Sequence, residues 1–215
     1  MQVVMGLGNP GPRYAATRHN VGFRCVEAAA AALGLRFSAE RPEYRAAVGD
    51  GPAGPVTILE PLTYMNRSGL ALAAWARDAG AVVAPVDAED ADPAPGITVP
   101  IVVCDDIQLP LGSIRIRASG SDGGQNGLAS VLAVVGHQRV PRLRLGVGPI
   151  GATVDPEDWA DYVLAPFADE ERERVEDLTV RGRDALLAVL ADGPEGAASR
   201  HNRRVRPASD LPEPP

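Results

Sequence analysis

The sequence predicts an α/β fold, a single domain built on a mixed, mostly parallel, twisted sheet that helices cover on both faces. Strand-like and helix-like segments alternate along the 215 residues, which is typical of a sheet between two layers of helices. Several strand candidates are continuous apolar runs, as expected of strands buried on both faces. Two short strand candidates between residues 44 and 59 lie close together around a turn, which indicates a hairpin and therefore a mixed sheet.

The strand candidates are apolar or alternating runs bounded by glycine and proline. Residues 2–7 read as a buried strand that ends at a glycine turn, and residues 99–104 are strongly apolar and predict a central strand. Residues 113–118 alternate Ile and Arg, which predicts a strand with one solvated face. The expected strands are residues 2–7, 44–49, 56–59, 99–104, 113–118 and 143–148.

The helix candidates are recognised by helical spacing or by an amphipathic pattern, and glycine ends the first two of them. Asn20 is the expected N-cap of the first helix, which Gly34 ends, and Gly80 ends the second. A glycine-rich stretch at residues 120–127 leads into the third, and exposed amides at a helix start suit a phosphate or a peptide backbone. The expected helices are residues 21–33, 67–79, 125–135 and 168–190.

Length and composition indicate one domain over residues 1–199 and a basic, then proline-rich, tail over residues 200–215 that we expect to be flexible. Residues 84–98 are acidic and rich in proline, and we expect them to form an exposed loop. No apolar stretch is long enough to cross a bilayer, and the first residues do not resemble a signal peptide, so a cytoplasmic protein without membrane contact is expected. Cys25 and Cys104 lie among apolar residues and are expected to be buried free thiols.

The net charge of −7 argues at first against a nucleic-acid partner, but the charges are segregated along the chain. Residues 113–150 hold five Arg against one acid, whereas residues 155–177 hold ten acids against two Arg. Arginines two apart on a strand share a face, so Arg115 with Arg117, and Arg142 with Arg144, could form a surface that contacts phosphates. Solvated side chains on an ordinary sheet face are the alternative.

His19 is the first candidate for a catalytic group. It lies between a first strand and a helix, and Asn9 lies in the same loop. Asp105 directly follows the apolar run 99–104, and a carboxylate at that point could hold the imidazole and raise its pKa, so that the other nitrogen takes a proton from water. From position alone the pairing of His19 with Asp105 is one possibility, and a surface or packing histidine is the other.

Other chemistries lack their motifs. The GLGNPG stretch at residues 6–11 matches the three-glycine dinucleotide pattern, but no helix starts at once and no ribose-binding acid follows. There is no Gly-x-Ser-x-Gly elbow for a serine nucleophile and no P-loop lysine. The three histidines are widely separated and no Cys-x-x-Cys is present, which argues against a metal site.

Six ordered stretches resemble the bacterial peptidyl-tRNA hydrolase family, from about residue 2 to residue 202. The first is GLGNPG at 6–11 together with Tyr14 and TRHNVG at 17–22, and the second is TYMNRSG at 63–69. The others are DDI at 105–107 with LPLG at 109–112, GGQNGL at 123–128, RLRLGVG at 142–148, and YVL at 162–164.

The resemblance implies a monomeric, metal-free enzyme without a cofactor that hydrolyses the ester between a peptide and the tRNA 3′ ribose. By position, His19 would be the base that activates water, and Asp105 would orient the His19 imidazole. Asn9 would position the ester, and Asn66 or nearby amides would bear the oxyanion. Substrate would also contact Tyr14, Met65, Asn66 and Asn126. The tRNA phosphates would meet Arg115, Arg117, Arg142 and Arg144.

This sequence departs from the family pattern at several places. Glu60, Leu62, Arg67, Gln108 and Ala165 stand where the family usually has other residue types. Two other functions are alternatives: a non-catalytic RNA-binding relative, and a small-molecule hydrolase or nucleotide-binding enzyme of the same fold class. An intact His19 and Asp105 pair argues against the first, and segregated arginines without a ribose-binding acid argue against the second.

Overall fold

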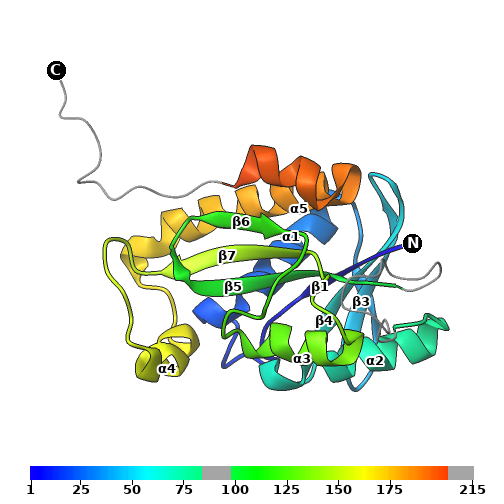
Figure 1. The fold of residues 1–215 in the computed structure, drawn as a ribbon, viewed down its shortest axis with the longest axis horizontal. Coiled ribbons are helices and arrows are strands. Elements are labelled where there is room, and N and C mark those ends of the chain that lie inside the picture. The colour runs from blue at the N-terminus through cyan, green and yellow to red at the C-terminus, as the bar shows by residue number, and fades with distance from the viewer. Residues whose placement is uncertain (84–97, 203–215) are drawn as a thin grey trace.

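The fold is described from a computed structural model over residues 1–83 and 98–202 (Figure 1). One sheet in these residues has the strand order β2-β3-β4-β1-β5-β7-β6. The parallel pairs are β4–β1, β1–β5 and β5–β7, whereas β2–β3, β3–β4 and β6–β7 are antiparallel. β3 and β6 run opposite to the other five strands, so the sheet is mixed and mostly parallel in strand direction, which confirms the predicted fold class. The strands are β1 Gln2–Gly6, β2 Phe37–Glu40, β3 Tyr44–Gly51, β4 Gly54–Pro61, β5 Ile101–Pro110, β6 Ile114–Arg117 and β7 Arg142–Gly148.

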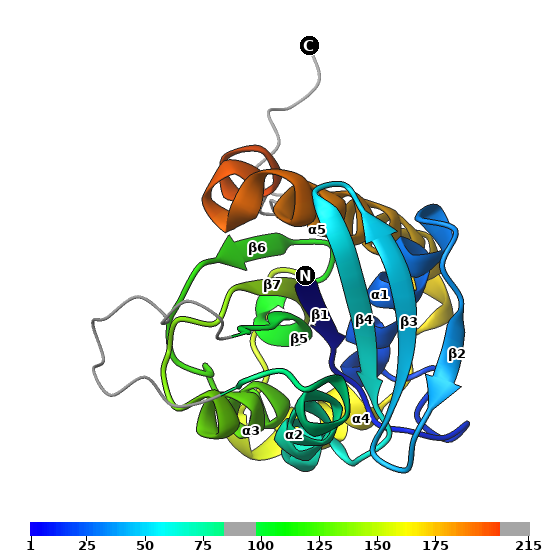
Figure 2. The same cartoon turned by 90° about the vertical axis from the view of Figure 1, so that its right-hand side faces the viewer.

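Helices cover both faces of the sheet (Figures 1 and 2). α1 and α5 pack together on one face, and α2 and α3 pack together on the other. The helices are α1 Val21–Ala32, α2 Ser68–Ala79, α3 Asn126–Val135, α4 Trp159–Leu164 and α5 Arg172–His201. Short 3-10 turns precede four of them, at η1 Arg18–Asn20, η2 Met65–Arg67, η3 Pro156–Asp158 and η4 Asp169–Glu171.

Each face of the sheet has its own aliphatic core. Val26 of α1 and Leu186 of α5 are fully buried on one side, and Leu72 of α2 and Val131 of α3 are fully buried on the other. Full burial of one such side chain contributes about 1.5–3 kcal/mol, so both layers stabilise the sheet that lies between them. Cys25 and Cys104 are buried free thiols, as expected.

Most expected elements are present with adjusted ends. β3 and β4 form the predicted hairpin, and Gly80 ends α2 in the left-handed conformation, with φ of 63°. β5 begins two residues later than expected and continues to Pro110. α5 begins at Arg172 rather than residue 168 and runs past residue 190, with a kink at Gly193 before Pro194.

β2 and α4 were not predicted. β2 has four residues and α4 has six, so neither is long enough to display a periodic pattern of its own. The acidic loop falls mostly at residues 84–97 and the tail mostly at residues 203–215, and these two segments lie outside the described residues.

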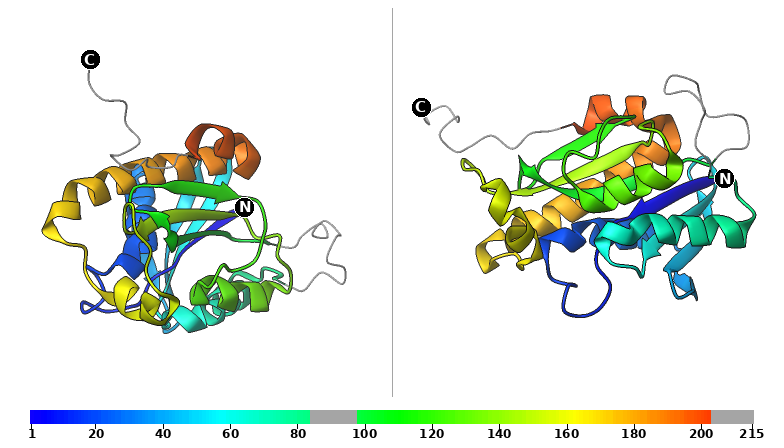
Figure 3. Two further views of the ribbon diagram at one scale, coloured as in Figure 1. Left: turned by 60° about the vertical axis from the view of Figure 1, so that its left-hand side comes forward. Right: turned by 60° about the horizontal axis from the view of Figure 1, so that its bottom comes forward.

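The parallel strands place the candidate site. β4, β1 and β5 end at the same edge of the sheet, so the loops that follow β1 and β4 and the end of β5 lie near one another. α4 lies beside the loop that follows β1 in both views of Figure 3. This edge therefore gathers polar residues that are up to about a hundred positions apart in the sequence.

Candidate active site

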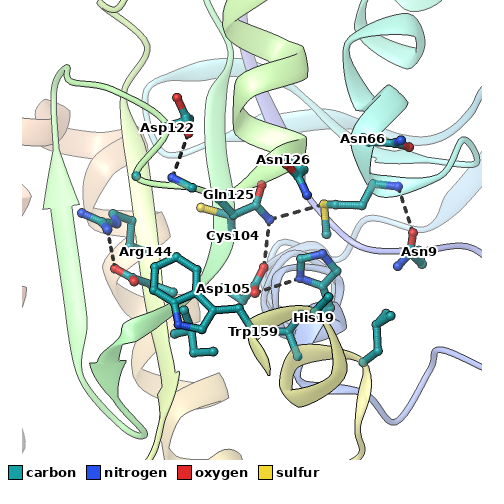
Figure 4. Close-up of a pocket in the computed structure, with 18 of the residues that line it drawn as sticks. Asn9, His19, Asn66, Cys104, Asp105, Asp122, Gln125, Asn126, Arg144 and Trp159 are labelled. Carbon is teal, nitrogen blue, oxygen red and sulfur yellow. Dashed lines mark hydrogen bonds and ion pairs between the residues drawn. The ribbon is translucent and has the colours of Figure 1, made fainter. Parts of the chain in front are cut away.

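A cavity of about 420 Å³ lies at the carboxyl edge of the parallel strands (Figure 4). α4 closes one side of it with Trp159 and Val163. The predicted site residues that line it are Asn9, His19, Met65, Asn66, Asp105, Asn126 and Arg144. The structure therefore brings together all three residues predicted to be catalytic and three of the four predicted to bind substrate.

His19 and Asp105 form a hydrogen-bonded pair. His19 lies in η1, and its Nδ1 is 2.8 Å from Oδ2 of Asp105. Their side chains are 12% and 3% exposed, respectively, so the pair is largely withdrawn from water. A carboxylate partner at Nδ1 fixes the neutral tautomer with its proton on Nδ1, which leaves Nε2 as the proton acceptor.

Two opposing effects act on the pKa of His19. Burial lowers the pKa because it disfavours the charged imidazolium, whereas the charge of Asp105 and its hydrogen bond raise the pKa. The effect of Asp105 prevails, so the pKa of His19 lies above its ordinary value. The imidazole is therefore a stronger base than burial alone would leave it.

Gln125, which was not among the predicted site residues, bonds the other oxygen of Asp105. Its Nε2 donates to Oδ1 of Asp105 at 2.9 Å, and its Oε1 accepts from the backbone N–H of Leu128 at 2.8 Å as the N-cap of α3. Both oxygens of Asp105 are thereby bonded, which fixes the plane of the carboxylate. Gln is uncommon at the N-cap of a helix, so a Gln at the expected start of α3 was a sequence signal that this side chain could have a role in the site.

Asn9 is held by two parts of the chain. Its backbone N–H donates to Oδ1 of Asn20 and its carbonyl accepts from Nδ2 of Asn20, both at 2.9 Å. Oδ1 of Asn9 accepts from the backbone N–H of Met65 at 2.8 Å. Asn20 is the N-cap residue of α1, as predicted, but its side chain makes no cap bond and holds the Asn9 backbone instead.

Arg18 anchors the turn that carries His19. It is 8% exposed, its guanidinium carbon lies 4.5 Å from the ring centre of Tyr162 and 5.1 Å from that of Phe167, and it pairs with Glu171 at 2.6 Å. Its backbone N–H also donates to the segment that follows α4. These contacts join the His19 turn to the α4 side of the cavity.

Two predicted substrate residues lie at the exposed edges of the cavity. Asn66 and Asn126 are exposed, and in the part of the chain that the structure describes their side chains make no hydrogen bond. Tyr14 does not line the cavity. It packs edge-on against Tyr64, which does line it, with 6.5 Å between ring centres.

The four predicted tRNA-binding arginines are cross-strand neighbours, Arg115 opposite Arg144 and Arg117 opposite Arg142. Arg117 is exposed and Arg115 is half-buried. Arg144 lines the cavity and pairs with Asp106 at 2.7 Å.

Arg142 differs from the other three arginines. It is 2% exposed and donates four hydrogen bonds to the carbonyl groups of Gly120, Ser121, Gln138 and Val140. The structure therefore does not place Arg142 on a surface that a phosphate could reach. It holds the glycine-rich loop instead.

Residues that depart from the family pattern take other partners. Glu60 is fully buried and pairs with Arg45; burial raises the pKa of Glu60 to about 7, although Arg45 opposes that shift. Gln108 donates to the carbonyl of Gly123 at 3.2 Å. Neither Glu60 nor Gln108 lines the cavity.

Residues 1–83 and 98–202 offer neither a metal site nor a membrane-spanning helix. No cluster there of three or more His, Cys, Asp or Glu side chains could hold a metal ion. In the same ranges, no helix has the length and apolar character needed to span a membrane.

Comparison with known proteins gives one consistent result. The sequence model of a family described as peptidyl-tRNA hydrolase matches residues 3–209. The chain is 38% identical over 205 residues to the peptidyl-tRNA hydrolase of Chlorobium phaeobacteroides, covering 95% of this chain and 100% of that protein. It is 40% identical over 202 residues to that of Chloroflexus aurantiacus, covering 94% and 99%. A crystal structure of peptidyl-tRNA hydrolase from Acinetobacter baumannii superposes with a TM-score of 0.77 at 27% identity, covering 95% of each chain.

Proposed function

Because the chain belongs to the peptidyl-tRNA hydrolase family and hydrolyses the ester bond between a peptide and its tRNA, we propose that His19 is the general base of this reaction. The observation that carries the proposal is the 2.8 Å hydrogen bond between His19 Nδ1 and Asp105 within the cavity. It leaves Nε2 to accept a proton from water, and Asp105 stabilises the imidazolium that forms.

The reaction needs few further groups. Water that loses a proton to His19 attacks the ester carbonyl. The tetrahedral intermediate then breaks its bond to the ribose oxygen, and the imidazolium gives its proton to that oxygen, which leaves as the hydroxyl. We assign the oxyanion to Asn66 or nearby backbone amides, because an amide side chain without a protein partner keeps its donors for substrate. Asn9 and Asn126 position the ester and the peptide, and Met65 shapes the cavity between them.

Arg115, Arg117 and Arg144 are the residues that we propose to meet tRNA phosphates. They lie on neighbouring strands, and Arg144 reaches the cavity itself. A phosphate at Arg144 would compete with Asp106 for the guanidinium, which reduces the gain from this contact. For Arg142 we propose a positioning role through the loop over residues 120–121.

The wider setting follows from the substrate. Peptidyl-tRNA is the partner, and we propose that the protein acts in the cytoplasm, where translation produces that substrate, as a monomer. The predicted domain ends at residue 199 and the predicted tail covers residues 200–215; because α5 runs to His201 and the Asn202 side chain bonds the Ile116 backbone, we propose a single domain that continues to residue 202. One sheet shared by two cores supports the single domain.

His19→Ala tests the proposal directly. We expect single-turnover release of an N-acetylated amino acid from tRNA to fall by about 10²–10⁴, because the base is lost. The Kd for uncharged tRNA should stay unchanged, since the arginines are untouched. Equal cleavage rates for the wild type and His19→Ala would exclude His19 as the base.

A further inference from the structure

Arg18 is a buried charged residue that directly precedes the proposed base, and the mechanism above does not use it. Its side chain is 9% exposed and does not line the catalytic cavity. A charged group is costly to bury unless it is paired and hydrogen-bonded. In the described part of the chain, the partners of its guanidinium all lie within residues 162–171: the carboxylate of Glu171, the carbonyl of Pro166 and the rings of Tyr162 and Phe167.

The backbone joins the same two segments. Thr17 forms an antiparallel bridge with Pro166, and the N–H of Arg18 donates to the carbonyl of Ala165 at 3.1 Å. Both partners directly follow α4, which forms one wall of the catalytic cavity. The turn that carries His19 is therefore attached to that wall by backbone and side-chain contacts together.

The loop before this turn gives it little other support. Residues 11–16 are mostly exposed, so they bury few side chains against the rest of the domain. α1 holds the carboxyl end of the turn, since it begins at Val21. At the amino end, the contacts with the segment after α4 hold the turn, and Arg18 supplies most of them.

We propose that Arg18 is a positioning residue, which holds the His19 turn against the segment after α4 so that the imidazole stays within reach of Asp105. The inference rests on the proposed function, in which His19 is the base. Without the contacts of Arg18 the turn can move away from β5, and the 2.8 Å bond between His19 and Asp105 lengthens. Burial would then lower the pKa of His19 without the opposing effect of Asp105, and the base would weaken.

The charge of Arg18 and its contacts predict opposite shifts in the pKa of His19. A cation near an imidazole lowers the pKa of that imidazole, so removal of the charge alone would raise the pKa of His19. Removal of the contacts lowers it, because the bond to Asp105 is weakened. The direction of the shift therefore distinguishes a positioning role from an electrostatic one.

Three variants and a control test the role of Arg18. Arg18→Met removes the charge and the polar contacts and keeps the apolar stem. Arg18→Lys keeps the charge but lacks the planar fork that reaches Pro166 and Glu171 together. Glu171→Gln leaves the guanidinium in place without its anion. Arg181→Met is the control, because Arg181 also forms an ion pair and donates to a backbone carbonyl, and it lies outside the cavity.

The measurements are the midpoint of the His19 imidazole by NMR titration, with His19→Ala to identify its signal, and kcat for N-acetylalanyl-tRNA. We expect a midpoint above 6.5 in the wild type and a lower one in both Arg18 variants. Their kcat should fall about tenfold to a hundredfold, because a small misplacement of a reacting group costs about that much. Glu171→Gln should shift both quantities in the same direction by less.

Two readouts separate this effect from a general loss of structure. Arg181→Met should leave the midpoint and kcat unchanged, even where urea denaturation shows that it lowers the free energy of unfolding as much as the Arg18 variants do. The Kd for uncharged tRNA should stay within about twofold of the wild type in every variant, because the arginines of β6 and β7 are untouched.

The inference is overturned if the midpoint rises or stays in place in the Arg18 variants, if their kcat equals that of the wild type, or if Arg181→Met loses as much kcat. If Arg18→Met does not fold, Arg18→Lys and Glu171→Gln decide the question by the same criteria. A His19→Ala enzyme that cleaves as fast as the wild type would remove the proposed base and this inference with it, whereas an unshifted midpoint removes the inference alone.

Discussion

The centre of the cavity and its edges are built differently. At the centre, protein groups bond both oxygens of Asp105, Nδ1 of His19 and Oδ1 of Asn9. At the edges, among the described residues, Asn66 and Asn126 bond to no protein group through their side chains. The proposed base and the groups that hold it are thus fixed before substrate arrives, which lowers the cost of reaching the transition state. The side chains that we propose to bind the oxyanion or the peptide keep their donors and acceptors for substrate.

The same contrast separates two arginines on one strand. Arg142 is buried against four carbonyl groups, whereas Arg144 reaches the cavity and pairs there with Asp106. They stand two residues apart on β7, and the carbonyl groups at residues 120 and 121 of the glycine-rich loop bond only the first. Position on a strand therefore does not decide whether an arginine can bind a phosphate; the neighbouring loop decides it.

Alanine substitutions of Asn66 and Asn9 test most strongly the difference between the edges and the centre of the cavity. Asn66→Ala should lower kcat by about 10²–10³ if Asn66 donates to the oxyanion, with the free energy of unfolding unchanged. Asn9→Ala should differ from Asn66→Ala in stability. It should lower the free energy of unfolding by about 1–3 kcal/mol, because it leaves the buried N–H of Met65 without an acceptor. Urea denaturation and single-turnover assays of both variants measure the two effects. If Asn66→Ala destabilised the fold as much as Asn9→Ala, the distinction between bonded side chains at the centre and unbonded side chains at the edges would be contradicted.

Alanine substitutions of Arg144 and Arg142 should give smaller effects, the first on tRNA binding and the second on stability. Arg144→Ala should weaken tRNA binding and reduce the slope of log K against log salt by about 0.9, the contribution of one phosphate contact. Arg142→Ala should leave that slope in place and lower the unfolding free energy by about 1–3 kcal/mol, since carbonyl groups lose buried donors. Binding titrations from low to moderate salt, paired with denaturation curves, distinguish the two. An unchanged slope in Arg144→Ala would remove that residue from the tRNA surface.

Patterns that depend on local sequence predicted most of the fold. Residues 2–6 and the first residues of β5, 101–104, are mostly apolar, as expected of strands that helices cover on both sides, so they stand out in the sequence. The hairpin of β3 and β4 was marked by its turn. β2 was not predicted, because four residues at the edge of a sheet are too few to show an alternation of apolar and polar residues. α5 ends later than expected because the helix resumes after the Gly193 kink.

Some contacts of the candidate site could be predicted from the sequence and others could not. Asp105 and His19 were linked because parallel strands bring their carboxyl ends together, a rule that sequence can apply. The role of Gln125 depends on where α3 begins relative to β5, which is a tertiary fact. Asn20 occupies the N-cap position of α1 as predicted, but the sequence could not show that its side chain bonds the Asn9 backbone, because that contact depends on the path of the loop after β1.

The pH dependence of kcat/KM, in the wild type and in Asp105→Asn, tests the role of His19 most directly. A general base acts only when neutral, so activity must rise with pH through the pKa of His19. Asp105 raises that pKa above the ordinary value of 6.5, whereas burial alone would lower it. We predict a midpoint above 6.5 in the wild type that falls below 6.5 in Asp105→Asn. A midpoint that Asp105→Asn leaves in place would contradict the pairing of His19 with Asp105 as the source of the base.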